Sequence, residues 1–315
     1  MGRHSNSGAV KTDGRGRGAG NGGVAKQKGK RNLKGILVPL LLILAGLSVL
    51  LYPVVATQWN YMKQMRAAEA YSQLEREEDP QRLRERFDAA VRYNAERGPA
   101  SILDPWNNDI GGDDPAYRAY LDQLNISETM GRIIVPAAGA DLPIYHGTSH
   151  DVLQKGVGHL YGTDLPVGGE STHSVLTGHT GLSNATLFDN LDDVEKGDPI
   201  YLAVSGEKLK YEVHDIQVVL PHETEGLATR PGEDLVTLIT CTPYGINSHR
   251  LLVTGHRVPM DPEDEGVFDD NGLNWQWWMW AILAAAVAAV IFLIFWLRKM
   301  LRRQPVDAAE TAKSD

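Results

Sequence analysis

The chain has 315 residues, one cysteine and a formal net charge of −9 at pH 7. A single cysteine excludes a framework of intramolecular disulfides. Between residues 36 and 297 there are 17 Lys and Arg against 36 Asp and Glu, a net charge near −19. This charge argues against nucleic acid or an anionic lipid surface as the partner of the central part.

Residues 1–35 are basic and glycine-rich, with nine Lys and Arg, ten Gly and one acidic residue. The segment has few large apolar side chains, and burying them cannot offset the entropy lost on ordering the segment. We therefore expect a disordered tail. A basic tail can bind nucleic acid. Here an apolar stretch follows it, and Lys and Arg are common on the cytoplasmic side of a membrane span, which explains the positive charge.

Two long apolar stretches flank the central part. Residues 36–55 carry no charge over 20 positions, and residues 277–297 form a second run of 21. Each is long enough to cross a bilayer as a helix. The first is longer than the apolar region of a signal peptide, which favours a retained anchor, although Val54-Val55-Ala56 has the spacing of a cleavage site and leaves removal open.

The charges beside these stretches predict the topology. Arg298 and Lys299 follow the second stretch at once, and Arg302 and Arg303 come soon after. Because Lys and Arg favour the cytoplasmic side, both terminal tails, 1–35 and 298–315, are expected in the cytoplasm. The central part, residues 56–274, would then lie outside the cell membrane.

The residues after the first stretch predict a helical stalk and then a loop. Residues 56–98 are rich in helix formers, and Asp79-Pro80 should end one helix and begin another, because Pro is accepted only in a first helical turn. Residues 99–116 change to Pro, Asp, Asn and Gly, which predicts a long loop. Its acids lack EF-hand spacing, so no metal site is expected there.

Residues 117–260 alternate short apolar runs with Gly, Pro and Asp turns, a pattern typical of a closed or sandwiched all-β domain. An acidic linker, 261–274, follows it. The candidate strands are 132–135, 142–145, 174–177, 199–204, 210–213, 216–220, 235–240 and 250–254.

Cys241 ends the apolar run 237–241, just before Thr242-Pro243. The end of a rigid strand fixes a side chain while leaving it accessible from a loop, which suits a nucleophile. The alternative is a small buried apolar residue, the commonest role of a free cysteine.

A thiol nucleophile needs a nearby base. His179 is favoured because it follows the candidate strand 174–177 and is flanked by Gly178 and Gly181, which allow a sharp turn that leaves the ring uncovered. The rival histidines are His173, His249 and His256.

Arg250 begins the strand after Cys241, so an antiparallel hairpin would bring the two together. Its guanidinium could donate hydrogen bonds to the oxyanion formed when a thiolate attacks a carbonyl. The alternative is a surface arginine or a structural ion pair. The Cys and His residues lack metal-ligand spacing, so neither a metal nor a cofactor is expected.

The run Thr237-Leu-Ile-Thr-Cys241, with Arg250 nine residues on and Thr177-Gly-His179 upstream, resembles the signature of sortases, the cysteine transpeptidases of Gram-positive surfaces. The block 165–182 resembles the corresponding block of class C, the pilus-building sortases. The similarity spans roughly residues 100–257.

This resemblance implies an eight-stranded sortase β-barrel with N-terminal helices. It makes Cys241 the nucleophile, His179 the general acid/base and Arg250 the stabiliser of substrate and oxyanion. It also makes Asp104-Pro105-Trp106 a lid, in which Asp104 approaches the arginine and Trp106 covers the thiol. Thr254 departs from the family, whose members frequently carry a basic residue there.

The implied reaction cleaves an LPxTG-like sorting signal and joins it, through a thioester, to the lysine amine of a pilin subunit. The alternative is a housekeeping sortase, which attaches surface proteins to the cell-wall precursor. A hydrolytic cysteine protease and a catalytically silent membrane-anchored scaffold are two further readings. The sequence leaves the pilin and its acceptor lysine open.

Overall fold

The computed structural model of the chain describes residues 33–98, 102, 104–107, 114–182, 185–269 and 275–302. Most of the two predicted tails, and parts of the predicted loop 99–116, therefore lie outside the described residues. The chain divides into two units, which meet between Ala45 and Gly46. The first holds the start of helix α1 (Leu33–Glu77), and the second holds the remaining elements.

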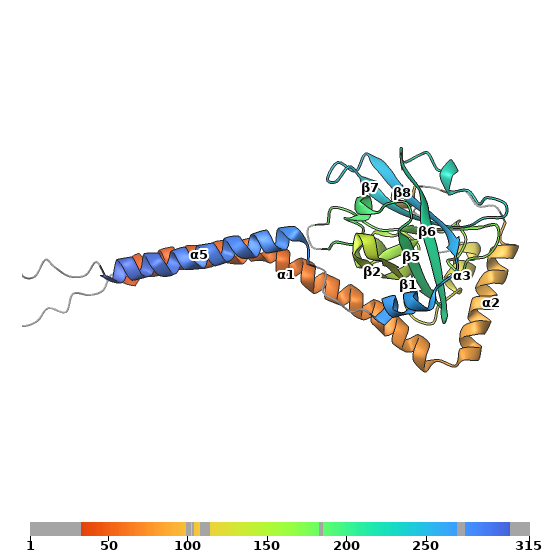
Figure 1. The fold of residues 1–315 in the computed structure, drawn as a ribbon, viewed down its shortest axis with the longest axis horizontal. Coiled ribbons are helices and arrows are strands. Elements are labelled where there is room, and N and C mark those ends of the chain that lie inside the picture. Colours follow the sequence, from red (N-terminus) through yellow and green to blue (C-terminus); the bar gives the residue numbers. More distant parts are fainter. Residues whose placement is uncertain are drawn as a thin grey trace, which may run out of the picture. The chain divides into compact units, whose positions relative to one another are not determined.

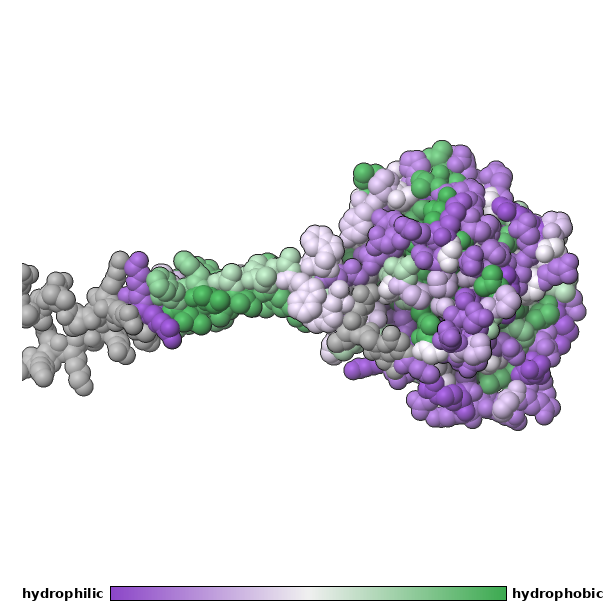
Figure 2. All heavy atoms as spheres, in the orientation of Figure 1, coloured by the Kyte–Doolittle hydropathy of each residue, from purple (hydrophilic) through white to green (hydrophobic). Residues whose placement is uncertain are grey.

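Helix α1 and helix α5 (Trp277–Arg302) are each long and apolar enough to cross a membrane. They contain the two stretches that the sequence predicted as membrane spans. Figure 2 shows the apolar surface along this part of the chain, in contrast with the largely hydrophilic surface of the barrel.

Helix α2 (Pro80–Glu96) begins where the sequence predicted a helix break. Pro80 occupies the first turn, and the Asp79 carboxylate accepts a hydrogen bond from the Gln81 backbone N–H at 2.9 Å, which caps the helix. The Tyr71 hydroxyl of α1 donates to the Met130 carbonyl and accepts from the Ser205 N–H. These bonds fasten α1 to the barrel that follows.

Eight strands form a closed barrel in the order β1-β2-β3-β4-β7-β8-β6-β5 (Figure 1). The predicted eight-stranded barrel is confirmed. Its interior is filled by aliphatic and aromatic side chains such as Met130, Ile133, Leu176, Phe188 and Val236. The strands are β1 Thr129–Val135, β2 Ala140–His146, β3 Val157–His159, β4 Thr172–Thr177, β5 Pro199–Val204, β6 Glu207–Val219, β7 Asp234–Thr242 and β8 His249–Val258.

Two of the individual strand predictions were wrong although the total was right. The candidates 210–213 and 216–220 are one strand, β6, whose pairing with β8 shifts register between Val213 and Asp215. This irregularity interrupts the alternation of the side chains, so the strand looks divided in the sequence. Strand β3 escaped prediction because it has three residues, one of them Gly158.

Short helices complete the domain. Helix α3 (Pro115–Leu121) is capped by Asp114, and helix α4 (His150–Lys155) is capped by Ser149. Within the predicted linker 261–274, Pro262–Asp269 forms the 3₁₀ helix η5. Phe268 of η5 packs against Tyr201, and its carbonyl accepts a hydrogen bond from buried Arg132 at 2.8 Å. This part of the stretch is therefore docked on the barrel.

Candidate active site

The strand pairing brings the predicted site residues to one end of the barrel. Strands β7 and β8 are antiparallel neighbours, and Cys241 lies directly opposite Arg250. Strand β4 runs parallel to β7 with Thr177 opposite Ile239, and the Gly178 N–H continues the ladder to the Ile239 carbonyl at 3.1 Å. The chain then turns at His179, beside the end of β7.

The turn that carries His179 is fixed by its neighbours. A Cβ at Gly178 would lie 2.6 Å from the Phe188 ring, so only glycine fits there. The Phe188 N–H donates to the His179 carbonyl at 3.1 Å. The Asp189 carboxylate accepts from the Gly181 N–H at 2.7 Å and from the Thr180 hydroxyl at 3.2 Å.

Asp189 was missed by sequence reasoning, because nothing in the local pattern distinguishes it from other surface acids. Burial raises its pKa to about 6, although the two hydrogen bonds partly counter this effect. It acts on the turn beside His179 through the backbone and the Thr180 hydroxyl, which makes it a positioning residue.

The Cys241 thiol is shielded from solvent, with 8% of the residue exposed. Burial raises its pKa above the ordinary value; the Arg250 charge lowers it and the Asp104 charge raises it further. The thiol is therefore protonated at neutral pH in this state. A base or a change in its surroundings is needed to make it a nucleophile.

His179 is a half-buried imidazole that stays neutral at pH 7. Burial lowers its pKa first, and the charge of His150, whose ring centre lies 6.4 Å away, lowers it further. The Trp106 indole N–H donates to His179 Nδ1 at 3.3 Å. The neutral ring then carries its proton on Nε2, which is buried and has no hydrogen-bond partner in the described part of the chain.

Arg250 is held by the predicted acid of the lid. Its Nε and Nη2 donate to the two Asp104 carboxylate oxygens at 2.7 and 2.9 Å, a bidentate ion pair. Burial opposes the charge, but the bond to Asp104 and the nearby Cys241 and Asp104 charges outweigh it and raise the pKa of Arg250. The Arg250 guanidinium also lies 4.5 Å from the centre of the Trp106 ring.

The segment predicted as a lid, described at Ile102 and Asp104–Asn107, packs against apolar side chains as well as polar groups. Ile102 and Trp106 pack against a cluster of buried side chains: Leu160, Val175, Leu227, Ile239 and Leu252. The Thr148 hydroxyl donates to the Pro105 carbonyl at 2.8 Å, and Thr148 is itself buried. No local pattern points to Thr148, because its contact depends on the folded path of residues 102–107.

The rival histidines have other surroundings. His173 is buried, and its Nε2 lies 2.7 Å from the Thr237 hydroxyl. His249 pairs with the neighbouring Ser248 hydroxyl. His256 faces the His214 ring, 5.2 Å between centres. Among the described residues, none of the three forms a hydrogen bond or ring contact with Trp106 as His179 does.

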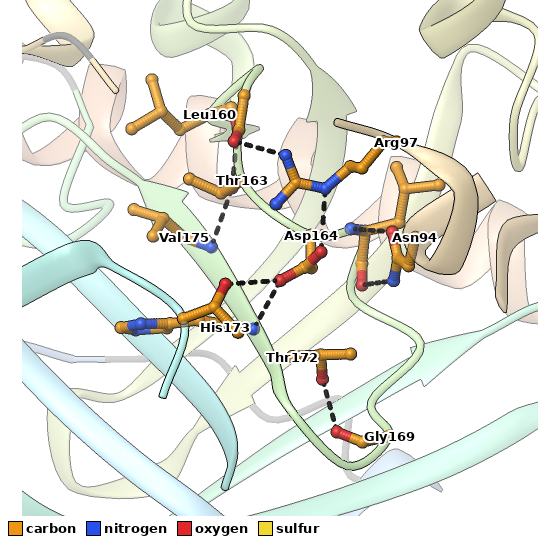
Figure 3. Close-up of polar contacts among 12 residues, drawn as sticks. Asn94, Arg97, Leu160, Thr163, Asp164, Gly169, Thr172, His173 and Val175 are labelled. Carbon is orange, nitrogen blue, oxygen red and sulfur yellow. Dashed lines mark hydrogen bonds and ion pairs between the residues drawn. The ribbon is translucent and has the colours of Figure 1, made fainter. Parts of the chain in front are cut away.

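The backbone of His173 belongs to a buried polar network (Figure 3). Its N–H donates to Asp164, which also accepts from Arg97 Nε at 2.8 Å. Asn94 exchanges two hydrogen bonds with the backbone of Leu165. This network fastens the end of α2 to the β3–β4 connection, immediately before the lid loop. Within the described ranges there is no group of three His, Cys, Asp or Glu that could hold a metal ion.

The Sortase domain model matches residues 133–258. Sortase SrtE2 of Streptomyces coelicolor is 30% identical over 188 residues, which cover 54% of this chain and 71% of that protein. The chain spans 65% and 62% of the length of two further curated sortases, at 31% and 30% identity.

Two solved structures show the same fold at higher identity. Sortase C-1 from Actinomyces oris is 58% identical with a TM-score of 0.56, and the match covers 57% of this chain and 99% of that one. Streptococcus pneumoniae sortase C is 43% identical with a TM-score of 0.59, covering 62% and 97%. The family match, the barrel and these relatives agree: the chain belongs to the sortase family of cysteine transpeptidases, with class C sortases among its structural neighbours.

Proposed function

We propose that this chain is a membrane-anchored, pilus-building transpeptidase that cleaves an LPxTG-like sorting signal and transfers it to a pilin lysine. The observation that carries the proposal is the closed lid segment, whose Asp104 pairs with Arg250 and whose Trp106 bonds to His179. The solved sortase C of Streptococcus pneumoniae, which this chain resembles, is described in connection with pilin substrate specificity.

The first half-reaction forms a thioester. Cys241 attacks the Thr carbonyl of the sorting signal, and its sulfur forms a bond to that carbon while the Thr–Gly amide bond breaks. The thiol proton passes through His179 to the departing amine. Arg250 donates hydrogen bonds to the oxyanion of the tetrahedral intermediate.

The second half-reaction restores the enzyme. The lysine amine attacks the thioester carbon, its proton passes through His179 to the leaving sulfur, and an isopeptide bond forms as Cys241 returns to the thiol. Arg250 can serve either half-reaction only after Asp104 has left it, because the carboxylate occupies both guanidinium nitrogens that face it. Lid opening is therefore part of the proposed cycle.

The proposed topology places the barrel outside the cell membrane, with both termini in the cytoplasm. Helices α1 and α5 support it by length and composition, and the basic residues after the second span support the orientation. Anchoring of enzyme and pilin precursor in one membrane raises their effective concentrations.

The test combines the full chain in detergent with a sorting-signal peptide and a pilin, and identifies the product by mass spectrometry. An isopeptide between the peptide threonine and a pilin lysine is expected, and Cys241→Ala should abolish it. Transfer to a wall-peptide amine in preference to the pilin would favour the housekeeping activity. Product formation by Cys241→Ala would refute the mechanism.

A further inference from the structure

The loop between the strands that carry Cys241 and Arg250 exposes two apolar side chains. It comprises residues 243–248, between β7 and β8, and contains no charged residue. Tyr244 is 66% exposed and Ile246 is 72% exposed. Single apolar residues are common on protein surfaces, so their exposure alone does not identify a binding surface. Their position relative to the predicted membrane spans is more informative.

The loop has a defined shape. The Ile246 and Asn247 N–H groups both donate to the Pro243 carbonyl, at 3.0 and 2.9 Å. Arg250 Nη1 donates to the Asn247 carbonyl at 3.3 Å. Because these bonds close the turn and tie it to the start of β8, Tyr244 and Ile246 are presented at its tip.

A hollow of about 640 Å³ connects this loop with the ends of the two predicted spans. Its lining includes Tyr244 from the loop, Tyr52 from α1 and Trp277 from α5. Tyr52 lies inside the uncharged stretch 36–55, and Trp277 is the first residue of the apolar stretch 277–297. Tyr244 therefore lies beside the ends of both predicted spans.

The two helices meet at the same level. The Gln58 side-chain amide donates to the Met279 sulfur at 3.1 Å, and Met279 is buried. Trp277 and Trp280 are exposed. Exposed tryptophans at the end of an apolar span are typical of the bilayer interface. Since Tyr244 lines one hollow with Trp277, a residue of the barrel is placed at that interface.

The charges around the hollow argue against electrostatic attraction to a lipid surface. Asp189, Asp192 and Asp193 line it, and none of the described residues that line it is basic. These carboxylates repel anionic headgroups, in agreement with the net charge near −19 of the central part. An uncharged loop with an aromatic and an aliphatic side chain enters the interface by burying apolar surface, which needs no anionic lipid.

We propose that the β7–β8 loop is a contact surface for the lipid bilayer, with Tyr244 and Ile246 buried in the interfacial layer. The inference rests on the proposed membrane anchoring of the chain. Cys241 precedes Tyr244 by three residues, about 10 Å of extended chain. The thiol then lies within about 10 Å of the interface, a position that favours a sorting signal held close to the membrane by its own anchor.

The experiment places a fluorescent dye on the loop of the full chain, reconstituted in phosphatidylcholine nanodiscs. Cys241→Ala removes the native thiol, and Ile246→Cys then carries the environment-sensitive dye NBD. The matched control is Leu74→Cys in the same background, because Leu74 is exposed and lies about 28 Å along α1 from Val55. The dye at residue 246 should emit at a shorter wavelength than the dye at residue 74. A lipid with a nitroxide on its headgroup should quench it more strongly.

Equal quenching at the two positions would overturn the proposal. So would a dye at residue 246 that responds only to added pilin, since the loop would then contact protein in place of lipid. Chains that do not enter the nanodiscs would refute the anchoring of the proposed function, whereas chains that enter them with an unquenched dye at residue 246 refute the loop contact alone. Tyr244→Cys, labelled in the same way, gives a second position should Ile246→Cys not fold.

Discussion

Replacement of Thr148 by valine should open the lid without touching the catalytic groups. Valine keeps the shape of the side chain but loses the hydroxyl that donates to the Pro105 carbonyl at 2.8 Å. Because Thr148 is buried, the carbonyl is left without a partner in the closed state, whereas water satisfies it when the lid is open. The closed state should lose about 1–2 kcal/mol, which raises the open population roughly 5- to 30-fold.

The assay is the second-order rate of Cys241 alkylation by iodoacetamide at pH 7, because the lid of the proposed mechanism must be displaced before the reagent reaches the thiol. Thr148→Val should react faster by the factor above, as long as the open state remains the minor one. Thr148→Ser keeps the hydroxyl and should stay close to the wild type. A Thr148→Val rate within two-fold of the wild type, with an unchanged unfolding temperature, would refute the assignment of Thr148 as a latch.

Three further substitutions test the site. Asp104→Asn removes a negative charge that, together with burial, raises the pKa of Cys241, and it also releases Arg250. The pH profile of Cys241 alkylation should therefore shift to lower pH. An unshifted profile counts against this coupling between Asp104 and Cys241. Trp106→Phe removes the N–H that stabilises neutral His179, so the His179 pKa, followed by NMR, should rise, whereas a fall would contradict the bond. Asp189→Asn removes a carboxyl whose pKa burial raises from 3.8 to about 6. Since the folded state binds that proton more tightly, wild-type stability falls as the pH rises through this window, and the variant should lack that fall; equal unfolding temperatures for the pair at both ends of the window would refute it.

The part of the site that depends on local pairing was predictable from the sequence. Cys241 and Arg250 lie on consecutive strands joined by a short loop, and an antiparallel hairpin places them together, as the register confirms. The position of a histidine after a strand and between glycines was equally visible. What these groups do chemically came from the family resemblance, because the residues alone left each of them with an ordinary structural alternative.

The non-local parts could not be predicted in the same way. The parallel pairing of β4 with β7 joins segments about sixty residues apart, and no local pattern specifies which strands will be neighbours. Thr148 and Asp189 have ordinary sequence contexts and gain their roles from the path of the lid and from the turn after β4. The docking of Phe268 on the barrel was not predicted either, because the acidic residues around it are typical of a solvated linker.

In the proposed mechanism, the contacts of the lid explain how one short segment can block a site that needs three groups. Asp104 occupies the guanidinium that an oxyanion requires, and Trp106 occupies the imidazole nitrogen Nδ1. Burial raises the pKa of Cys241, and the Asp104 charge of the same segment raises it further. A substrate of the proposed reaction must therefore replace the lid at all three points, with a carbonyl at Arg250, an amine within reach of His179 and a carbon at the thiol. A peptide that supplies only one of these groups must still open the lid, but it gains the binding free energy of one contact. The closed lid would therefore discriminate against incomplete substrates as well as against water.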